Sequence, residues 1–237
     1  LVYDQFCTGD EPIGYRSTTN MLLLQQPDST HLYYLFHRSV YFTITPLVAY
    51  GDKLRYSVVD VAKNNGEGLV LEKNTIILED TLSYDGICAV RHGNGRDWWI
   101  LTTREKSNNY FTFLFTPEGL TMFEQTIGVP TWSEAGGEIL FSPDGSKLAR
   151  FNPRDDLRVF DFDRCTGLLS NPVHVPVIDD ADEDLTGSAA FSADGRFLYC
   201  AEVERLLQFD MFASDLAESK KIIAERKSNP ECPNGSS

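Results

Sequence analysis

The chain carries the same short segment twice, and this duplication constrains the fold more than any other feature. Phe141–Ala149 reads Phe-Ser-Pro-Asp-Gly-Ser-Lys-Leu-Ala, and Phe191–Tyr199 reads Phe-Ser-Ala-Asp-Gly-Arg-Phe-Leu-Tyr. Each copy contains the end of one apolar strand, an Asp-Gly turn and a second apolar strand. An Asp-Gly pair supplies the positive φ that tight hairpin turns need, so each copy predicts a β-hairpin. Two copies spaced 50 residues apart indicate an internal repeat.

Short apolar runs recur along most of the chain in groups of four, separated by turns. The groups keep a constant register, since Val90, Phe141 and Phe191 end equivalent strands at spacings of 51 and 50 residues. Four units of four strands are typical of a β-propeller, in which neighbouring sheets cover each other's faces. We therefore predict an all-β chain of four-stranded antiparallel blades. About four blades are expected, over residues 20–80, 86–128, 137–178 and 186–226.

Four segments depart from this repeat. Residues 1–19 show little periodicity and are predicted to be the remnant of a preceding blade or a loose segment. Residues 227–237 are predicted to be a disordered tail. The first unit is longer than the others because residues 38–53 are inserted between its second and third strands. Residues 214–225 predict one helical turn leading into a strand, with a short helix as the alternative.

Aromatic residues inside the predicted strands indicate packing between blades rather than a shelf for a ligand. Trp98 and Trp99 are adjacent in one strand, and the run of residues 110–115 contains four further aromatic side chains. One blade cannot bury both of its faces alone, whereas neighbouring blades can cover each other. We therefore expect these rings in the core.

The charge of the chain narrows the range of its partners. With 35 acidic and 21 basic residues, the formal net charge is −14. Binding of nucleic acid needs clustered Lys and Arg, and so does docking on anionic lipid, so we expect neither. No apolar run approaches the roughly 18 residues of a membrane span. We therefore also expect no membrane insertion.

The sequence offers no motif for metal binding or catalysis. None of the five cysteines stands at zinc-ligand spacing from another cysteine or a histidine. Cys88 and Cys200 lie within apolar runs and are predicted to be buried, whereas Cys165 and Cys232 could pair or stay free. The motifs of serine hydrolases, zinc proteases and phosphate-binding loops are not found. We predict no catalytic residues, no metal and no cofactor.

Propeller connectivity predicts which loops share a rim. Turns between first and second strands, and between third and fourth strands, lie on one rim, which the Asp-Gly turns crowd. Second-to-third turns and blade-to-blade connections lie on the other, and it receives the least repetitive loops. Binding functions concentrate on such loops. The candidate binding residues there are Tyr41, Phe42, Tyr50, Arg104, Lys106, Arg154, Asp155, Asp179 and Asp180.

Two of these loops have unusual compositions. The insertion at residues 38–53 is aromatic and apolar, and it is either a contact surface or an extended hairpin folded back on its blade. The connection at residues 179–184 is acidic. It lacks the spaced aspartates and the glycine of a calcium loop, so it is predicted to be a solvated loop.

Several segments together resemble a known family. They include Leu32–Phe36, Leu54–Asp60, His92–Trp99, Phe141–Ala149 and Phe160–Asp163. This set, spread over roughly residues 17–226, resembles the WD-like or YVTN-like propeller domain of surface proteins that Bacteroidota export by the type IX secretion route. The resemblance implies a larger, seven-bladed propeller at the cell surface or outside the cell, and it brings no catalytic residues.

The chain departs from that family by ending after four recognisable blades and by showing no sorting domain. The departure implies either that the chain is a fragment or that missing blades or a partner cover its open sheet edges. The favoured function is a non-catalytic, secreted or cell-surface scaffold that binds a protein or glycan. Two alternatives stay open: a propeller hydrolase or lactonase with a site at the channel mouth, and a periplasmic interaction module of an envelope machine.

Overall fold

The computed structural model describes residues 20–44, 47–132, 136–177 and 187–225, and these form four antiparallel sheets of four strands each. The first sheet contains β1 (Met21–Gln25), β2 (Leu32–Ile44), β3 (Leu47–Asp60) and β4 (Leu69–Ser83). The second contains β5 (Cys88–Arg91), β6 (Trp98–Thr103), β7 (Asn109–Thr116) and β8 (Gly119–Thr126). The third contains β9 (Glu138–Phe141), β10 (Lys147–Asn152), β11 (Asp156–Asp163) and β12 (Leu168–Val175). The fourth contains β13 (Ser188–Phe191), β14 (Phe197–Ala201), β15 (Arg205–Asp210) and β16 (Lys221–Glu225).

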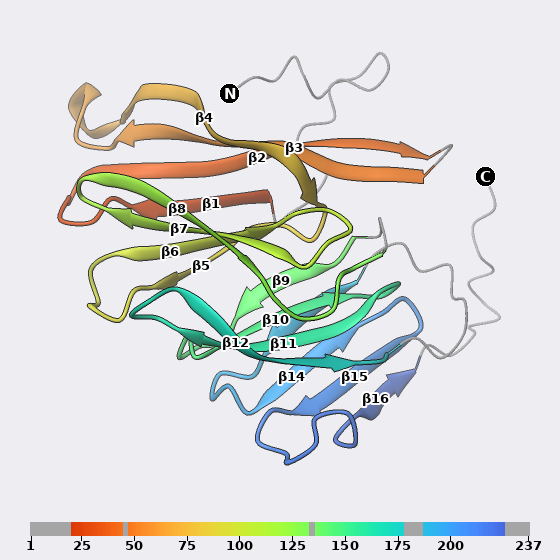
Figure 1. The fold of residues 1–237 in the computed structure, drawn as a ribbon. Coiled ribbons are helices and arrows are strands. Elements are labelled where there is room, and N and C mark those ends of the chain that lie inside the picture. The colour runs from red at the N-terminus through yellow and green to blue at the C-terminus, as the bar shows by residue number, and fades with distance from the viewer. Residues whose placement is uncertain (1–19, 45–46, 133–135, 178–186, 226–237) are drawn as a thin grey trace, which may run out of the picture.

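The four sheets are propeller blades, as the repeat predicts. In every sheet the strands lie side by side in chain order, and the sheets stack one on the next (Figure 1). The first strands of the later blades approach one another, because β9 contacts both β5 and β13. The first strand of each blade is therefore the inner one. The prediction of an all-β chain with about four blades is confirmed.

The Asp-Gly segments form hairpins, but the turn is longer than a two-residue one. Gly145 has φ +72°, whereas Asp144 keeps a negative φ. The Gly145 N–H donates to the Ser142 carbonyl at 2.8 Å, and the Ser142 N–H donates to the Lys147 carbonyl at 2.9 Å. The Asp144 carboxylate accepts from the Ser142 hydroxyl at 2.6 Å and thus closes the loop. Aspartate here supplies an acceptor, and only glycine supplies the left-handed conformation.

Apolar clusters fill the three interfaces between successive blades. The aromatic residues expected in the core are at most 2% exposed, namely Trp99, Tyr110, Phe111, Phe113 and Phe115. Trp98 packs against the cluster between the first two blades. Cys88 and Cys200 are buried, as predicted, and both are unpaired; Cys165 is exposed and unpaired. Cys232 lies outside the described residues.

The first blade has one face that no other described sheet covers. Leu22 and Leu24 point into the cluster shared with the second blade. Met21 and Leu23 alternate with them in β1 and are 42% and 60% exposed. Since side chains alternate across a strand, these two belong to the opposite face. The open apolar surface is thus a sheet face, and not only the sheet edge that the sequence suggested.

The insertion in the first blade continues β2 and β3 as an extended hairpin. β1 pairs with β2 only as far as His37, and β4 pairs with β3 as far as Tyr50. Beyond these points the hairpin is two-stranded, and it projects past the rest of the sheet (Figure 1). The extended hairpin is confirmed, but it projects from its blade instead of folding back on it.

The segment before the last strand forms turns. The Ser219 N–H donates to the Leu216 carbonyl, and the Lys220 N–H donates to the Ala217 carbonyl, both at 3.2 Å. β16 begins at Lys221. Of the predicted helical turn leading into a strand, the strand is confirmed, whereas the segment before it forms hydrogen-bonded turns and not the alternative short helix.

Candidate functional site

The second-to-third turns and the blade-to-blade connections share one rim, as the connectivity predicts. The Glu105 N–H, in a turn of the second blade, donates to the Thr81 carbonyl near the end of the first blade at 2.8 Å. The Trp132 N–H, in the next connection, donates to the Asp155 carboxylate of the third blade at 2.8 Å. We call this rim the connection rim. The opposite rim, which carries the Asp-Gly turns, is the turn rim.

The extended hairpin brings two of the predicted residues together on the connection rim. Tyr41 and Tyr50 are paired across β2 and β3, and their ring centroids lie 5.3 Å apart. Tyr41 is 52% exposed. Phe42 follows it in β2, and its side chain lies outside the described part of the chain. The pair presents an aromatic surface at the point where the hairpin leaves the sheet.

Arg104 and Lys106 lie in the neighbouring turn of the second blade. Arg104 donates to Asp80 at 2.7 Å and to Glu124 at 3.2 Å, and its guanidinium lies 5.1 Å from the centre of the Phe111 ring. The hydrogen bonds to Asp80, with Glu124 beside it, raise the pKa of Arg104. Lys106 is exposed and has φ +48°. Arg104 therefore joins two blades as well as facing solvent.

The remaining predicted residues divide between exposed, buried and undescribed positions. Arg154 is exposed at the tip of its turn. Asp155 is 5% exposed and pairs with Arg158 at 3.1 Å. Burial raises the pKa of Asp155, and the Arg158 guanidinium opposes that rise. Asp155 is thus a buried residue that stabilises the connection rim through its ion pair with Arg158. Asp179 and Asp180 lie outside the described residues.

A buried ion pair at the inner end of the connection rim was not found by sequence reasoning. Arg150 donates through Nε to Asp85 Oδ2 at 2.6 Å and through Nη2 to the Ser83 hydroxyl at 2.9 Å. Asn152 donates to the other Asp85 oxygen at 3.1 Å. Arg38 of the first blade donates to the Ser83 carbonyl. The network therefore ties the first blade and its connection to the third.

The electrostatics of this network suit a structural role. Asp85 is 0% and Arg150 is 2% exposed. Burial works against the charge of Arg150, but the Asp85 carboxylate and Tyr110 together raise its pKa above the ordinary value. Burial lowers the pKa of Arg38 to about 10. A general acid or base needs an oxygen within reach of substrate, whereas both Asp85 oxygens are bonded within the protein.

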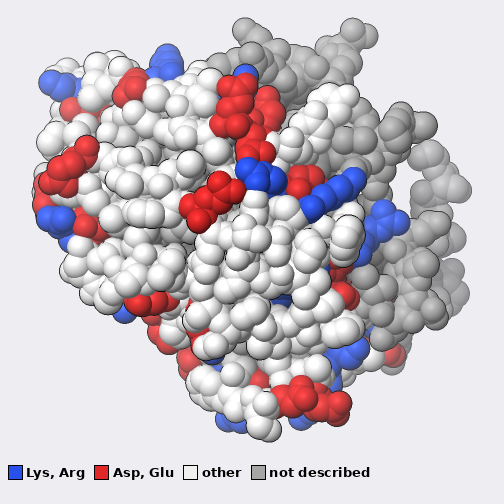
Figure 2. Space-filling model, in the orientation of Figure 1, with Lys and Arg blue, Asp and Glu red and all other residues white. Residues whose placement is uncertain are grey.

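No group of three or more His, Cys, Asp or Glu side chains is placed to hold a metal ion within residues 20–44, 47–132, 136–177 and 187–225. In that same part of the chain, no helix is both long and apolar enough to cross a membrane. On the face shown in Figure 2, acidic and basic side chains lie interspersed between broad uncharged areas. That face offers no broad basic surface of the kind that nucleic acid requires.

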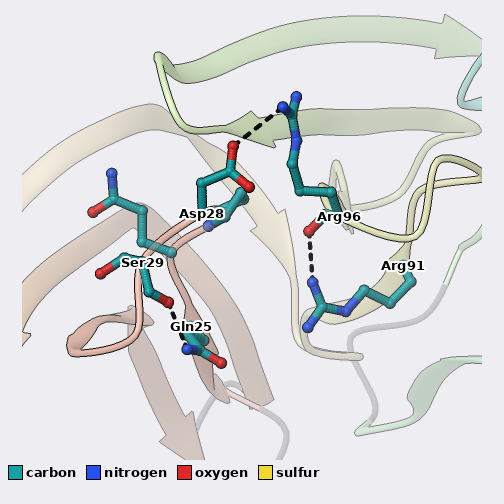
Figure 3. A pocket seen from close by; sticks show the side chains of 7 residues that line it. Gln25, Asp28, Ser29, Arg91 and Arg96 are labelled. Atoms are coloured by element: carbon teal, nitrogen blue, oxygen red, sulfur yellow. Dashed lines mark hydrogen bonds and ion pairs between the residues drawn. The ribbon is translucent and has the colours of Figure 1, made fainter.

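A small pocket lies on the turn rim, between the first two blades. It has a volume of about 140 Å³. The turn between β1 and β2 forms one wall, and the turn between β5 and β6 forms the other (Figure 3). The lining residues are Gln25, Gln26, Pro27, Asp28, Ser29, Arg91 and Arg96. The sequence motif His92–Trp99 marks this turn, but its arginines gave no functional signal by themselves.

The geometry of the blades defines the fold class of this protein, which is a β-propeller. No protein-family model matches the chain, and no curated protein matches it. Among solved structures, a protein from Lactobacillus plantarum matches with a TM-score of 0.50 and 14% identity, over 88% of this chain and 68% of its own. The likeness at this identity shows the fold alone.

Two further matching structures are described by an enzyme name. A candidate 6-phosphogluconolactonase from Bacteroides fragilis matches with a TM-score of 0.49 and 17% identity, over 85% of this chain and 57% of its own. The periplasmic gluconolactonase of Pseudomonas aeruginosa matches with a TM-score of 0.47 and 16% identity, over 88% of this chain and 66% of its own. The chain therefore spans between 57% and 68% of these three proteins.

Proposed function

We propose that this chain is a binding module, a non-catalytic part of a propeller whose connection rim holds a protein or glycan partner. The observation that carries the proposal is the extended hairpin, which is two-stranded beyond the sheet and presents the tilted ring pair of Tyr41 and Tyr50. Exposed aromatic residues on a rigid support are favoured contacts in binding surfaces, because they offer large contact area at low entropic cost.

The neighbouring turns extend this surface with charge. Arg104 is fixed by Asp80, Glu124 and the Phe111 ring, so its guanidinium is held in place before a partner arrives. A preorganised side chain loses less conformational entropy on binding. The buried pair of Asp85 and Arg150 supports the same rim from below. The rim is thus a rigid platform bearing a projecting aromatic hairpin.

Ligand selection on the immobilised chain tests the proposal. A glycan array and a phage-displayed peptide library would be screened against the natural chain, and then against the double variant Tyr41→Ser with Tyr50→Ser. We expect selected ligands to lose binding to the double variant. The matched control is Phe212→Ser, because Phe212 is 74% exposed but follows β15 on the turn rim. Ligands that lose binding only to the control would overturn the proposal.

A location outside the cell or at its surface is part of this proposal, with the periplasm as its alternative, and it rests on the family resemblance of the sequence. Further blades or a partner would cover the open face of the first blade, where Leu23 is 60% exposed. A lactonase function remains the competing class. Turnover of gluconolactone by the chain, lost when exposed carboxylates of the connection rim are replaced, would favour that class over a binding module.

A further inference from the structure

The pocket on the turn rim has one arginine whose donors are largely uncommitted. Arg96 is neutralised, because it pairs with Asp97 at 2.7 Å and with Asp28 at 3.2 Å. Arg91 has no carboxylate partner within the described residues. Its Nη1 donates to the Arg96 carbonyl at 2.6 Å. The Nε and Nη2 edge of the guanidinium therefore keeps the paired donors that match a carboxylate.

The Arg91 side chain is fixed in position before any ligand binds. Its guanidinium carbon lies 3.7 Å from the centre of the Trp98 ring. The Trp98 indole is fixed in turn, since its Nε1 donates to the Gln25 carbonyl of the first blade at 3.1 Å. Stacking on an aromatic face and the bond to Arg96 together orient the fork of donors. Figure 3 shows the guanidinium pointing towards the turn that contains Gln25 and Ser29.

The other walls of the pocket are polar and suit hydroxyl groups. Asp28 uses one carboxylate oxygen on Arg96, so its other oxygen can accept from a ligand hydroxyl. Gln25 donates its amide to the Ser29 carbonyl at 2.6 Å, which leaves its side-chain oxygen as an acceptor. The Ser29 hydroxyl oxygen accepts from the Leu32 N–H at 3.0 Å, which leaves the hydroxyl proton free to donate to a ligand. These groups can form hydrogen bonds with several ligand hydroxyls at the same time.

The charges of the pocket favour a singly charged ligand. Arg91 and Arg96 contribute two positive charges, and Asp28 and Asp97 contribute two negative ones. A phosphate dianion would face two carboxylates and a chain of net charge −14. A carboxylate needs only the free edge of Arg91. The volume of about 140 Å³ is below the roughly 300–1,000 Å³ of drug-sized sites.

We propose that this pocket binds a small sugar acid, with the carboxylate on Arg91 and the hydroxyls on Asp28, Gln25 and Ser29. The site lies on the rim opposite the proposed partner surface. The sugar-acid proposal therefore does not depend on the proposed function, and each can be tested without the other.

Titration of the ¹⁵N-labelled chain at low ionic strength, followed by NMR, tests the proposal. The probes are D-glucuronate, D-glucose, acetate and inorganic phosphate. We expect glucuronate to shift the amides of residues 25–29 and 91–97, and to bind at least about tenfold more tightly than the other three probes, as one charge-assisted bidentate contact would give. Arg91→Gln should lower glucuronate affinity by at least about tenfold.

Two further variants serve as a control and as a test that distinguishes binding of the sugar hydroxyls from binding of the carboxylate. Arg196 occupies the equivalent turn of the fourth blade and lies 4.9 Å from the Phe197 ring, so Arg196→Gln is the matched control and should leave binding unchanged. Asp28→Asn should weaken glucuronate binding and strengthen acetate binding, because it replaces one of the two carboxylate acceptors by an amide donor and removes a repulsive charge. Glucose or acetate binding as tightly as glucuronate, tighter binding of phosphate, or no shift in the pocket amides would each overturn the proposal.

Discussion

Replacing Asp85 by asparagine tests whether the buried ion pair holds the connection rim together. The Asp85 carboxylate is 0% exposed and accepts from Arg150, Asn152 and Ser83 at 2.6, 3.1 and 2.8 Å. Asparagine keeps the shape but removes the charge, and it leaves Arg150 buried without its paired carboxylate. Breaking one side of a buried ion pair costs about 3–5 kcal/mol. We expect a loss of that size in the free energy of unfolding.

Urea denaturation followed by tryptophan fluorescence measures this loss. With a slope of about 2–3 kcal/mol per molar urea, the midpoint should fall by about 1–2.5 M. Arg196→Gln is the control, because it removes the exposed ion pair with Asp210 on the turn rim. Exposed pairs contribute little, so its midpoint should stay that of the natural chain. A midpoint for Asp85→Asn that falls no further than the control would refute the role of Asp85.

Two other predictions use the same denaturation assay. Gly137→Ala places a Cβ against the Phe151 carbonyl oxygen and 2.6 Å from the Asp85 carboxylate, so it should cost about 1–3 kcal/mol. An unchanged midpoint would contradict the close packing there. Burial and the nearby Arg55 charge lower the pKa of His37 from 6.5 to about 4. The unfolded chain therefore binds the proton more readily, and stability that is present above pH 6.5 should be lost as the pH falls towards 4. His37→Gln should flatten this part of the profile, and a profile that keeps its slope would count against the buried neutral histidine.

Local sequence patterns predicted most of the fold. The spacing of the Asp-Gly segments and the alternating apolar runs predicted four blades of four strands, and the structure has them. This success has a physical cause, because each blade repeats the same turn chemistry and must bury the same faces against its neighbours. The run from Tyr110 to Phe115 was predicted in the core for that reason, and it packs there.

The candidate site was predicted less completely. Connectivity placed Tyr41, Arg104 and Arg154 on one rim, because the rim of a loop depends only on the order of strands. The partners of those residues were not predictable. Glu124 binds Arg104 from within the same sheet, whereas Asp80 belongs to the first blade, and only the stacking of the two sheets brings it within reach. Asp155 looked like a surface residue in sequence, yet its pairing with Arg158 places it inside the rim.

The sequence by itself determined the repeat, the class of fold, and the rim on which each loop emerges. Tertiary structure alone decided which charges meet across blades. Asp85 and Arg150 are 65 residues apart, and Arg91 and Gln25 belong to separate blades. Burial and pairing of charges depend on distances between sheets, which no local pattern encodes. The buried ion pair of Asp85 and Arg150 and the turn-rim pocket were found only in three dimensions, because both are formed between blades.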